Sequence, residues 1–228
     1  EALPQQLLML QTVDQALADA GLTERQRRER AGVIVGMALD LNTSNFHFRW
    51  VLERQARTWA ARLGLNLTEA QFQSWVDQLR AQASEPLNAG RVQGSLGGLI
   101  ASRIAREFGF GGPSFTVSAA EASGLRALEI GVRSLQRGEL DLVVVGAVDL
   151  CGDVRSICCT HALRAYSRTG QARPFDMRGG GGTIGEGAVA LVLKRLPDAQ
   201  RDEDRVYAVV RGLGFAGGSK QGYPSEQA

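Results

Sequence analysis

Hydrophobic positions along the chain alternate between a helical and a strand-like spacing. Near the amino end they recur at helical spacing, at Leu3, Leu7, Leu10, Val13 and Leu17. Gly21 follows this stripe and is typical of a helix C-terminal cap. A continuous apolar run then predicts a buried strand at residues 32–38.

The segment between residues 42 and 86 predicts a helical insertion. Its bulk comes from Trp50, Trp59, Phe72, Trp75 and Leu79. Thr68-Glu-Ala-Gln71 has the pattern of a capping box, in which each of the two outer side chains accepts a backbone amide of the other. The large side chains either close a local helical hairpin or contact another subunit, and the sequence leaves both interpretations open.

The rest of the chain continues this alternation. A helix rich in small residues is predicted from about residue 91 to 108, and Gly109 ends it. A central or interface strand is predicted at 115–119, and a mostly buried helix follows at 122–137. A strand at 141–149 then leads into a loop that carries cysteine and histidine. The last two predicted strands lie at 187–193 and 205–212.

An acidic residue occupies the turn between the strand at 115–119 and the helix after it. Glu121 stands at a helix N-terminus, where unpaired amides and the helix dipole stabilise an anion. Enzymes place thiolates and oxyanion donors at such turns. A plainer interpretation is that Glu121 is an ordinary helix-start acid with a small stabilising effect.

The residues around Glu121 resemble the active-site segment of β-ketoacyl synthases, the condensing enzymes of fatty acid and polyketide assembly. From residue 112 the chain reads Gly-Pro-Ser-Phe-Thr-Val-Ser-Ala-Ala-Glu-Ala-Ser-Gly-Leu-Arg-Ala-Leu. Laid over the family motif, Glu121 takes the position of the nucleophilic cysteine, Ser118 that of an aspartate, and residues 122–124 those of three serines. The resemblance implies a condensing-enzyme site that lacks its nucleophile.

Six further blocks resemble the same family in order, at residues 4–22, 32–36, 141–149, 173–176, 185–188 and 193–196. They imply the α/β fold class, with a thiolase-like layered α/β/α architecture. Residues 1–228 would be a partial domain, the amino-terminal half of a ketosynthase truncated at both ends, and both catalytic histidines would follow residue 228. His47 and His161 lie outside the matching motifs and are interpreted as surface or loop residues.

The resemblance is greatest to chain-length-factor-type domains, which keep the ketosynthase fold without the nucleophile, in polyunsaturated fatty acid and iterative polyketide synthases. It implies support of acyl chain elongation by a member of an acyltransferase family that is itself catalytically deficient. One alternative is a malonyl decarboxylase, for which ionised Glu121 is unfavourable because it repels the malonyl carboxylate. The other is a purely structural dimer partner.

The same resemblance implies the partners. Acyl carrier protein would bring the phosphopantetheine arm, so no cofactor of the chain's own is expected. An active ketosynthase domain, or a second copy, would pair through the strand before the nucleophile turn, at Ser114, Phe115, Thr116, Val117 and Ser118.

Composition excludes several other classes of protein. Twenty-six basic residues are offset by 24 acidic ones, so the net charge of +2 gives no electrostatic case for nucleic acid. The longest apolar runs are strand-length, far short of the roughly 20 residues that cross a bilayer. Cys151, Cys158 and Cys159 lack metal or disulfide spacing and fit a reducing cytoplasm. A substitute nucleophilic role for one of them is disfavoured because none lies at a strand-to-helix turn.

Glycine-rich loops suggest, and then exclude, a nucleotide site. Residues 180–185 and 212–217 both satisfy Gly-x-Gly-x-x-Gly. A dinucleotide loop follows a strand and opens a helix, whereas the first of these precedes a predicted strand and the second is followed by no predicted helix. We therefore interpret residues 179–187 as a tight turn.

Overall fold

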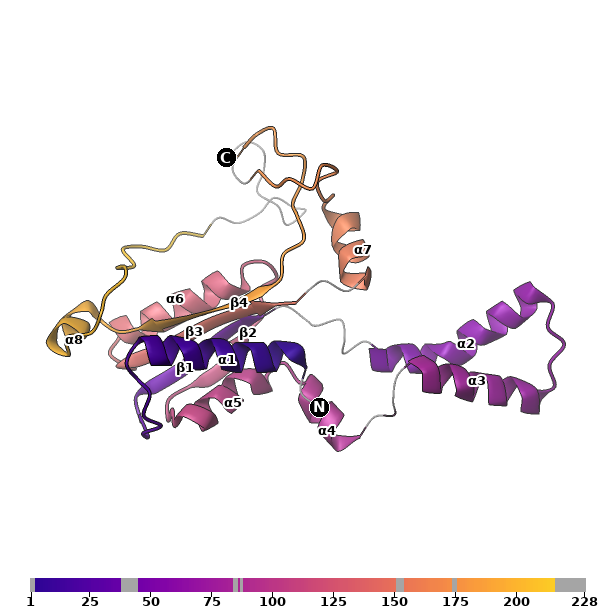
Figure 1. Cartoon of the computed structure of the whole chain (residues 1–228), viewed down its shortest axis with the longest axis horizontal. Helices are drawn as coiled ribbons and strands as arrows, with labels where there is room; N and C mark the ends of the chain where they lie inside the picture. The colour runs from indigo at the N-terminus through magenta and orange to yellow at the C-terminus, as the bar shows by residue number, and fades with distance from the viewer. Residues whose placement is uncertain are drawn as a thin grey trace.

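A computed structural model describes residues 3–37, 45–83, 86, 88–150, 154–173 and 176–215. Its centre is a four-stranded sheet in the order β2-β1-β3-β4. The strands are β1 (Ala31–Met37), β2 (Ser114–Val117), β3 (Leu142–Asp149) and β4 (Gly187–Leu193). Helices α1 (Pro4–Asp19) and α5 (Leu99–Phe108) cover one face, and α6 (Ser123–Gln136) covers the other (Figure 1). This layering confirms the predicted α/β/α architecture.

Strand β1 lies inside the sheet and is buried along its whole length. It pairs in parallel with β2, where Val33 lies opposite Ser114, and with β3, where Ala31 lies opposite Leu142. Strand β4 returns antiparallel to β3. A strand between two parallel neighbours and two helical layers needs apolar residues on both sides, which explains the unbroken run at 31–37.

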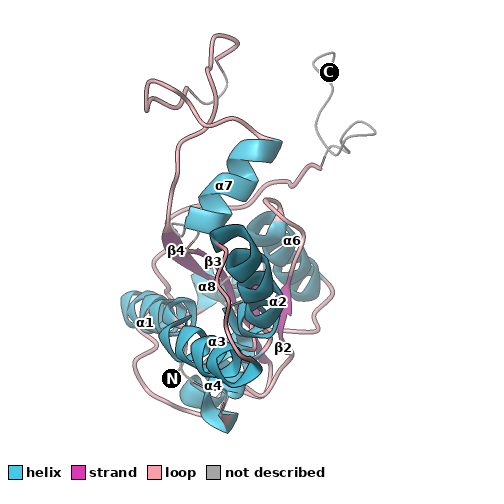
Figure 2. Cartoon of the chain, turned by 90° about the vertical axis from the view of Figure 1, so that its right-hand side faces the viewer, coloured by secondary structure: helices cyan, strands magenta, loops and turns pink. Residues whose placement is uncertain are grey.

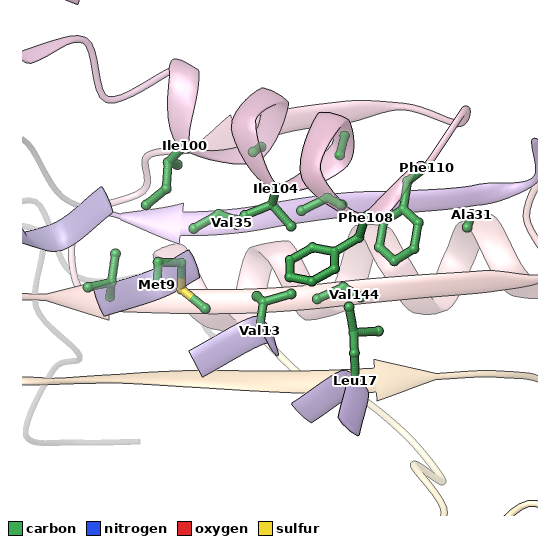
Figure 3. Packing of buried hydrophobic residues seen from close by; sticks show 14 of the residues in the cluster. Met9, Val13, Leu17, Ala31, Val35, Ile100, Ile104, Phe108, Phe110 and Val144 are labelled. Atoms are coloured by element: carbon green, nitrogen blue, oxygen red, sulfur yellow. The ribbon is translucent and has the colours of Figure 1, made fainter. Parts of the chain in front are cut away.

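The larger core lies between the sheet and helices α1 and α5 (Figure 3). Met9, Val13 and Leu17 of α1 are at most 2% exposed and pack with residues of α5, β1 and β3. The predicted stripe was wrong in part, because Met9 is buried whereas Leu7 is 58% exposed. Apolar residues occur on two faces of this helix, and only packing on the sheet selects one.

Backbone caps end the helices that flank the sheet. Gly21 adopts a φ of +71°, and the amide of Leu22 donates to the carbonyl of Leu17 at 2.8 Å. This pattern confirms Gly21 as the cap of α1. Gly109 caps α5 in the same left-handed conformation, also as expected.

The predicted helix at 91–108 is instead two helices. Helix α4 covers Ala89–Ser95, and α5 begins only at Leu99. The amide of Leu99 donates to the carbonyl of Leu96 at 3.1 Å, so a tight turn joins them. Gly97 and Gly98 occupy this turn, and the low helix propensity of two successive glycines accounts for the break.

Two antiparallel helices, α2 (Asn45–Leu63) and α3 (Glu69–Ala83), form a hairpin that projects from the sheet (Figure 1) and faces the viewer in Figure 2. Ala56, Phe72 and Val76 make its core, with Trp59 and Trp75 packed against them. The capping box is present, since the Thr68 amide donates to Gln71 Oε1 at 2.9 Å and the Gln71 amide to Thr68 Oγ1 at 3.3 Å. Trp59 and Trp75 fit the interpretation in which the large side chains close the hairpin. Trp50 does not, because it is 76% exposed.

Two expectations for the carboxyl-terminal third were wrong. The loop expected to carry cysteine and histidine forms α7 (Val154–Leu163), whose residues are all at least partly exposed. Residues 205–212 form no strand, and within the described residues their backbone pairs with no neighbour. Side chains hold this segment instead, because Arg205 and Tyr207 both contact Asp19 of α1, at 2.8 and 3.0 Å.

Arg195 ties together the end of α6, the start of β3 and α8 (Leu196–Arg201). Its guanidinium donates to the carbonyls of Leu135 and Leu140, at 3.2 and 2.7 Å, and to Asp141 Oδ1 at 2.6 Å. Hydrogen bonds from Arg30 and then Arg195 lower the pKa of Asp141 to about 2. No helix in the described part of the chain is both long and apolar enough to cross a membrane.

Candidate functional site

The predicted strand-to-helix turn is present between β2 and α6. Ala120 adopts a φ of +49°, an uncommon left-handed conformation for a residue with a Cβ. Ser123 holds the turn, because its Oγ accepts from the amide of Ala119 at 2.9 Å and donates to the carbonyl of Ala120 at 2.5 Å. The hydroxyl thus satisfies backbone groups that the turn would otherwise leave unpaired.

Helix α6 lies unusually close to the sheet at this turn. A Cβ added to Gly36 of β1 would come within 2.5 Å of the Gly124 amide nitrogen and of the Ser123 carbonyl. A Cβ on Gly131 would lie 2.7 Å from Val145. Backbone atoms leave no room for a side chain at residue 36, whereas a side chain at residue 131 would require Val145 to shift. The contact at Gly36 fixes the turn against the central strand. The helix buries one face only, so the expectation of a mostly buried helix was too strong.

Glu121 projects from this turn into a solvent-accessible position, with its side chain 68% exposed. Its Oε1 lies 3.0 Å from Nη2 of Arg164, the residue directly after α7. Helix α6 has Ala122 at its N-cap and no side-chain cap. The contact that the structure gives Glu121 is therefore an ion pair with an arginine from another segment.

An apolar cavity of about 580 Å³ opens beside Glu121. Its walls come from the start of α6 and from β1, β3 and β4, and its lining includes Met37, Leu125, Leu128, Val145, Val148 and Leu191. Polar groups are few and include Glu121, Ser123 and Asp149. The cavity is wide open to solvent, and its lining is predominantly hydrophobic.

The predicted interface residues form an edge of the sheet. Ser114–Val117 are strand β2, which confirms a strand there, and Ser118 follows it. Among the residues that the structure describes, strand β2 pairs with β1 alone, and Phe115 is 38% exposed. Edge strands present unpaired backbone groups, so the geometry permits the predicted contact without testing it.

Other candidate residues lie on α7, the helix that Arg164 follows, or outside the described residues. Cys158, Cys159 and His161 are exposed on α7, where His161 Nδ1 accepts from the amide of Tyr166 at 3.1 Å. Cys151 and the side chain of His47 lie outside the described residues. No group of His, Cys, Asp or Glu in the described ranges could hold a metal ion. The glycine-rich segment before β4 leads directly into that strand, as expected.

Sequence reasoning missed Arg164. Arg164 lies 43 residues after Glu121 in the sequence and outside the motifs that resemble the family. No local spacing links the two residues, because they meet only through the fold.

A sequence model of the family described as "Beta-ketoacyl synthase, N-terminal domain" matches residues 1–199. The chain belongs to the β-ketoacyl synthase family. This assignment confirms the resemblance to the family and the thiolase-like fold.

Relatives and solved structures agree with this assignment. The chain is 32% identical over 212 residues to a polyunsaturated fatty acid synthase polypeptide of Thraustochytrium sp., covering 92% of this chain and 10% of the relative. It is 34% identical over 210 residues to "Mycocerosic acid synthase-like polyketide synthase" of Mycobacterium tuberculosis, covering 92% of this chain and 8% of that protein. The chain therefore spans about a tenth of the length of these relatives.

Among solved structures, "PfaC Keto synthase-Chain length factor" matches with a TM-score of 0.71 and 29% identity, over 85% of this chain and 20% of that one. A ketosynthase from module 1 of the bacillaene synthase of Bacillus amyloliquefaciens matches with a TM-score of 0.65 and 25% identity, over 92% and 32%. Both neighbours carry the ketosynthase fold on which the candidate site is built.

Proposed function

We propose that this chain is part of a chain-length-factor-type ketosynthase unit, which supports acyl chain elongation on acyl carrier protein without forming an acyl-enzyme itself. The observation that carries the proposal is Glu121 at the nucleophile turn, exposed and ion-paired with Arg164 at 3.0 Å. The similarity to a structure titled as a ketosynthase–chain length factor supports the same choice. Cytoplasmic location is part of this proposal.

The chemistry of a carboxylate argues against acyl transfer at this turn. Attack by Glu121 on a thioester would give a mixed anhydride, which is high in energy and prone to hydrolysis. An ionised carboxylate engaged by an arginine is also a weak nucleophile. An ion-paired carboxylate would therefore occupy the family's nucleophile position, and condensation would take place at another site.

The neighbouring cavity supports a role in accommodating the acyl chain. It lies directly beside the nucleophile turn, and most of its lining is aliphatic. Burial of methylene groups in such a cavity is favourable by about 0.8 kcal/mol each. A unit of this kind would contribute apolar surface to the growing chain, while an active ketosynthase partner supplies the cysteine.

Pairing with that partner is proposed through residues 114–118. Strand β2 is a four-residue edge strand with an exposed side and is continuous with the turn that bears Glu121. A contact along this edge would bring the partner close to the cavity. Sedimentation that finds a monomer at all accessible concentrations, with and without an active ketosynthase, would contradict this part of the proposal.

The deciding experiment is exposure of the chain to an acyl-thioester donor, followed by intact-mass and peptide mass spectrometry. No stoichiometric acyl adduct is expected on the wild type, and cerulenin should not label position 121. Glu121→Cys is the matched control, since it restores a thiol at the turn and can accept label without restoring condensation. Stoichiometric acylation of Cys151, Cys158 or Cys159 in the wild type would overturn the non-catalytic assignment.

A decarboxylase is the second candidate, favoured only by the family's turn geometry. Ionised Glu121 would repel a malonyl carboxylate at close range. In a full-length protein, Glu121→Gln should therefore raise malonyl decarboxylation. Equal decarboxylation by wild type and variant would show that charge at this position does not suppress that reaction.

A further inference from the structure

The hairpin of α2 and α3 projects from the sheet, and one row of its side chains takes no part in its core (Figure 1). Trp50 of α2 is 76% exposed. Further exposed residues follow it at intervals of four, at Arg54, Thr58 and Arg62. Side chains four residues apart form a ridge on a helix, and such ridges pack into the grooves of a neighbouring helix. We call the row Trp50, Arg54, Thr58 and Arg62 the α2 ridge.

The two arginines of the α2 ridge carry charges that the hairpin does not neutralise. Every carboxylate between residues 45 and 83 is ion-paired with Arg57 or Arg80, at 3.1–3.5 Å. Arg54 and Arg62 have no carboxylate partner among the described residues. The ridge therefore presents an exposed indole together with two positive charges.

This composition differs from that of an ordinary solvated helix face. Tryptophan and arginine are the residues most enriched at the energetic centres of protein interfaces, where a large side chain is buried beside a few polar anchors. Ala56, Phe72 and Val76 form the small core of the hairpin, and Trp50 adds nothing to it. Contact with a partner would remove the Trp50 side chain from water, which the hairpin alone does not do.

We propose that the α2 ridge is a docking surface for an acidic helix of another protein or domain. Charge complementarity selects an acidic occupant, because a neutral or basic helix would leave both arginines unmatched. The ridge geometry selects a helix. The inference goes beyond the proposed function and does not rest on it, since neither Glu121 nor the cavity takes part.

The spacing of the ridge fixes what the partner must present. Arg54 and Arg62 are eight residues apart, which corresponds to about 12 Å along the helix axis. Carboxylates about two turns apart on the partner helix would match this separation. An apolar side chain one turn beyond the first carboxylate would then meet Trp50.

The test uses two synthetic peptides of about 20 residues, long enough to be helical on their own. One is built from glutamate, alanine and leucine, with its glutamates along one face. The other has glutamine at every glutamate position and is otherwise identical. Both carry fluorescein, so fluorescence anisotropy measures their binding to the whole chain. The glutamate peptide should bind several-fold more tightly, and added salt should weaken it, because exposed charges are screened.

Intrinsic fluorescence locates the contact, because all three tryptophans of the chain lie in the hairpin. Binding should shift the emission to shorter wavelength as Trp50 leaves water. Trp50→Ala should abolish this shift and weaken the glutamate peptide roughly tenfold or more. Arg54→Gln and Arg62→Gln should each weaken it roughly threefold to tenfold, as for unit charges about 4 Å apart in well-solvated surroundings.

Two control variants make the same chemical changes outside the hairpin. Arg103→Gln removes an exposed arginine of α5, and Leu7→Ala removes an apolar side chain of α1 that is 58% exposed. Both should bind the glutamate peptide like the wild type. Circular dichroism checks that each variant is folded. Loss of binding in the controls to the same extent as in Arg54→Gln and Trp50→Ala would overturn the inference.

Other results would reject an acidic helix as the occupant. Equal binding of the two peptides would do so. Self-association in sedimentation that is lost in Trp50→Ala would assign the ridge to a second copy of the chain instead. Tighter binding of a single-stranded oligonucleotide than of the glutamate peptide, weakened by Arg54→Gln, would assign it to nucleic acid. None of these results bears on acyl transfer at Glu121, which mass spectrometry tests separately.

Discussion

The close approach of α6 to β1 predicts a large cost for the smallest possible side chain at residue 36. In Gly36→Ala, the new Cβ would lie 2.5 Å from three backbone atoms, the Gly124 amide nitrogen and the Ser123 carbonyl carbon and oxygen. Ordinary contacts begin near 3.4 Å, so α6 must move by almost 1 Å. Backbone on both sides leaves no flexible side chain to yield.

Overpacking of this kind costs about 1–3 kcal/mol, and the rigid surroundings favour the upper end. For a domain of this size, about 3 kcal/mol corresponds to a loss of about 6–12 °C in melting temperature. Urea denaturation followed by far-ultraviolet circular dichroism measures the change in the free energy of unfolding. Gly187→Ala is the matched control, because a Cβ there meets nothing within 4 Å, and it should stay within about 0.5 kcal/mol of wild type.

The same substitution should also disturb the site, because the displaced residues 123 and 124 carry the turn of Glu121. A midpoint equal to that of Gly187→Ala would refute the reasoning, since it would mean that α6 does not seat on β1 at this level.

Three further outcomes are expected. Arg195→Ala should lower stability by about 2–3 kcal/mol, because two carbonyls at the end of α6 and the start of β3 lose a charged donor, whereas Arg195→Lys should recover part of the loss in the same urea titration. Asp141 stabilises the fold while ionised, so acid titration should show this contribution intact above pH ~4 and lost progressively as pH falls towards about 2, and Asp141→Asn should remove that dependence. Phe72→Ala should loosen the helical hairpin, which contains all three tryptophans, so tryptophan fluorescence should change well before the sheet unfolds by circular dichroism; a single coincident transition would contradict this.

The sequence predicted the layers and the turn because both depend on short-range patterns. A buried run specified β1, glycine caps ended α1 and α5, and the Thr68–Gln71 box marked the start of α3. Periodicity was a poorer guide where two faces of one helix are apolar, as at Leu7. It also failed at residues 205–212, where β-prone residues find no neighbouring strand in the described part of the chain.

The site was predictable in position but not in composition. Motif spacing placed Glu121 at the turn, whereas its arginine partner comes from a distant segment that no local pattern connects to it. The cavity could not be predicted for the same reason, since its lining comes from one helix and three strands. The interactions of Glu121 therefore depend on which distant residues the fold brings close to it, such as Arg164.

The parallel pairing of β1 with β3 has a consequence for how this chain assembles. Pairing of β1 with β3 brings Ala31 opposite Leu142, so it closes a loop of more than a hundred residues. The entropy of closing such a loop grows only with the logarithm of its length, so a hairpin inserted within it adds little to the cost. Helices α2 and α3 pack mainly on each other and can form early, as a local unit. The crossover after β1 is therefore a place where chain length can vary between proteins while the order of assembly of the sheet stays the same.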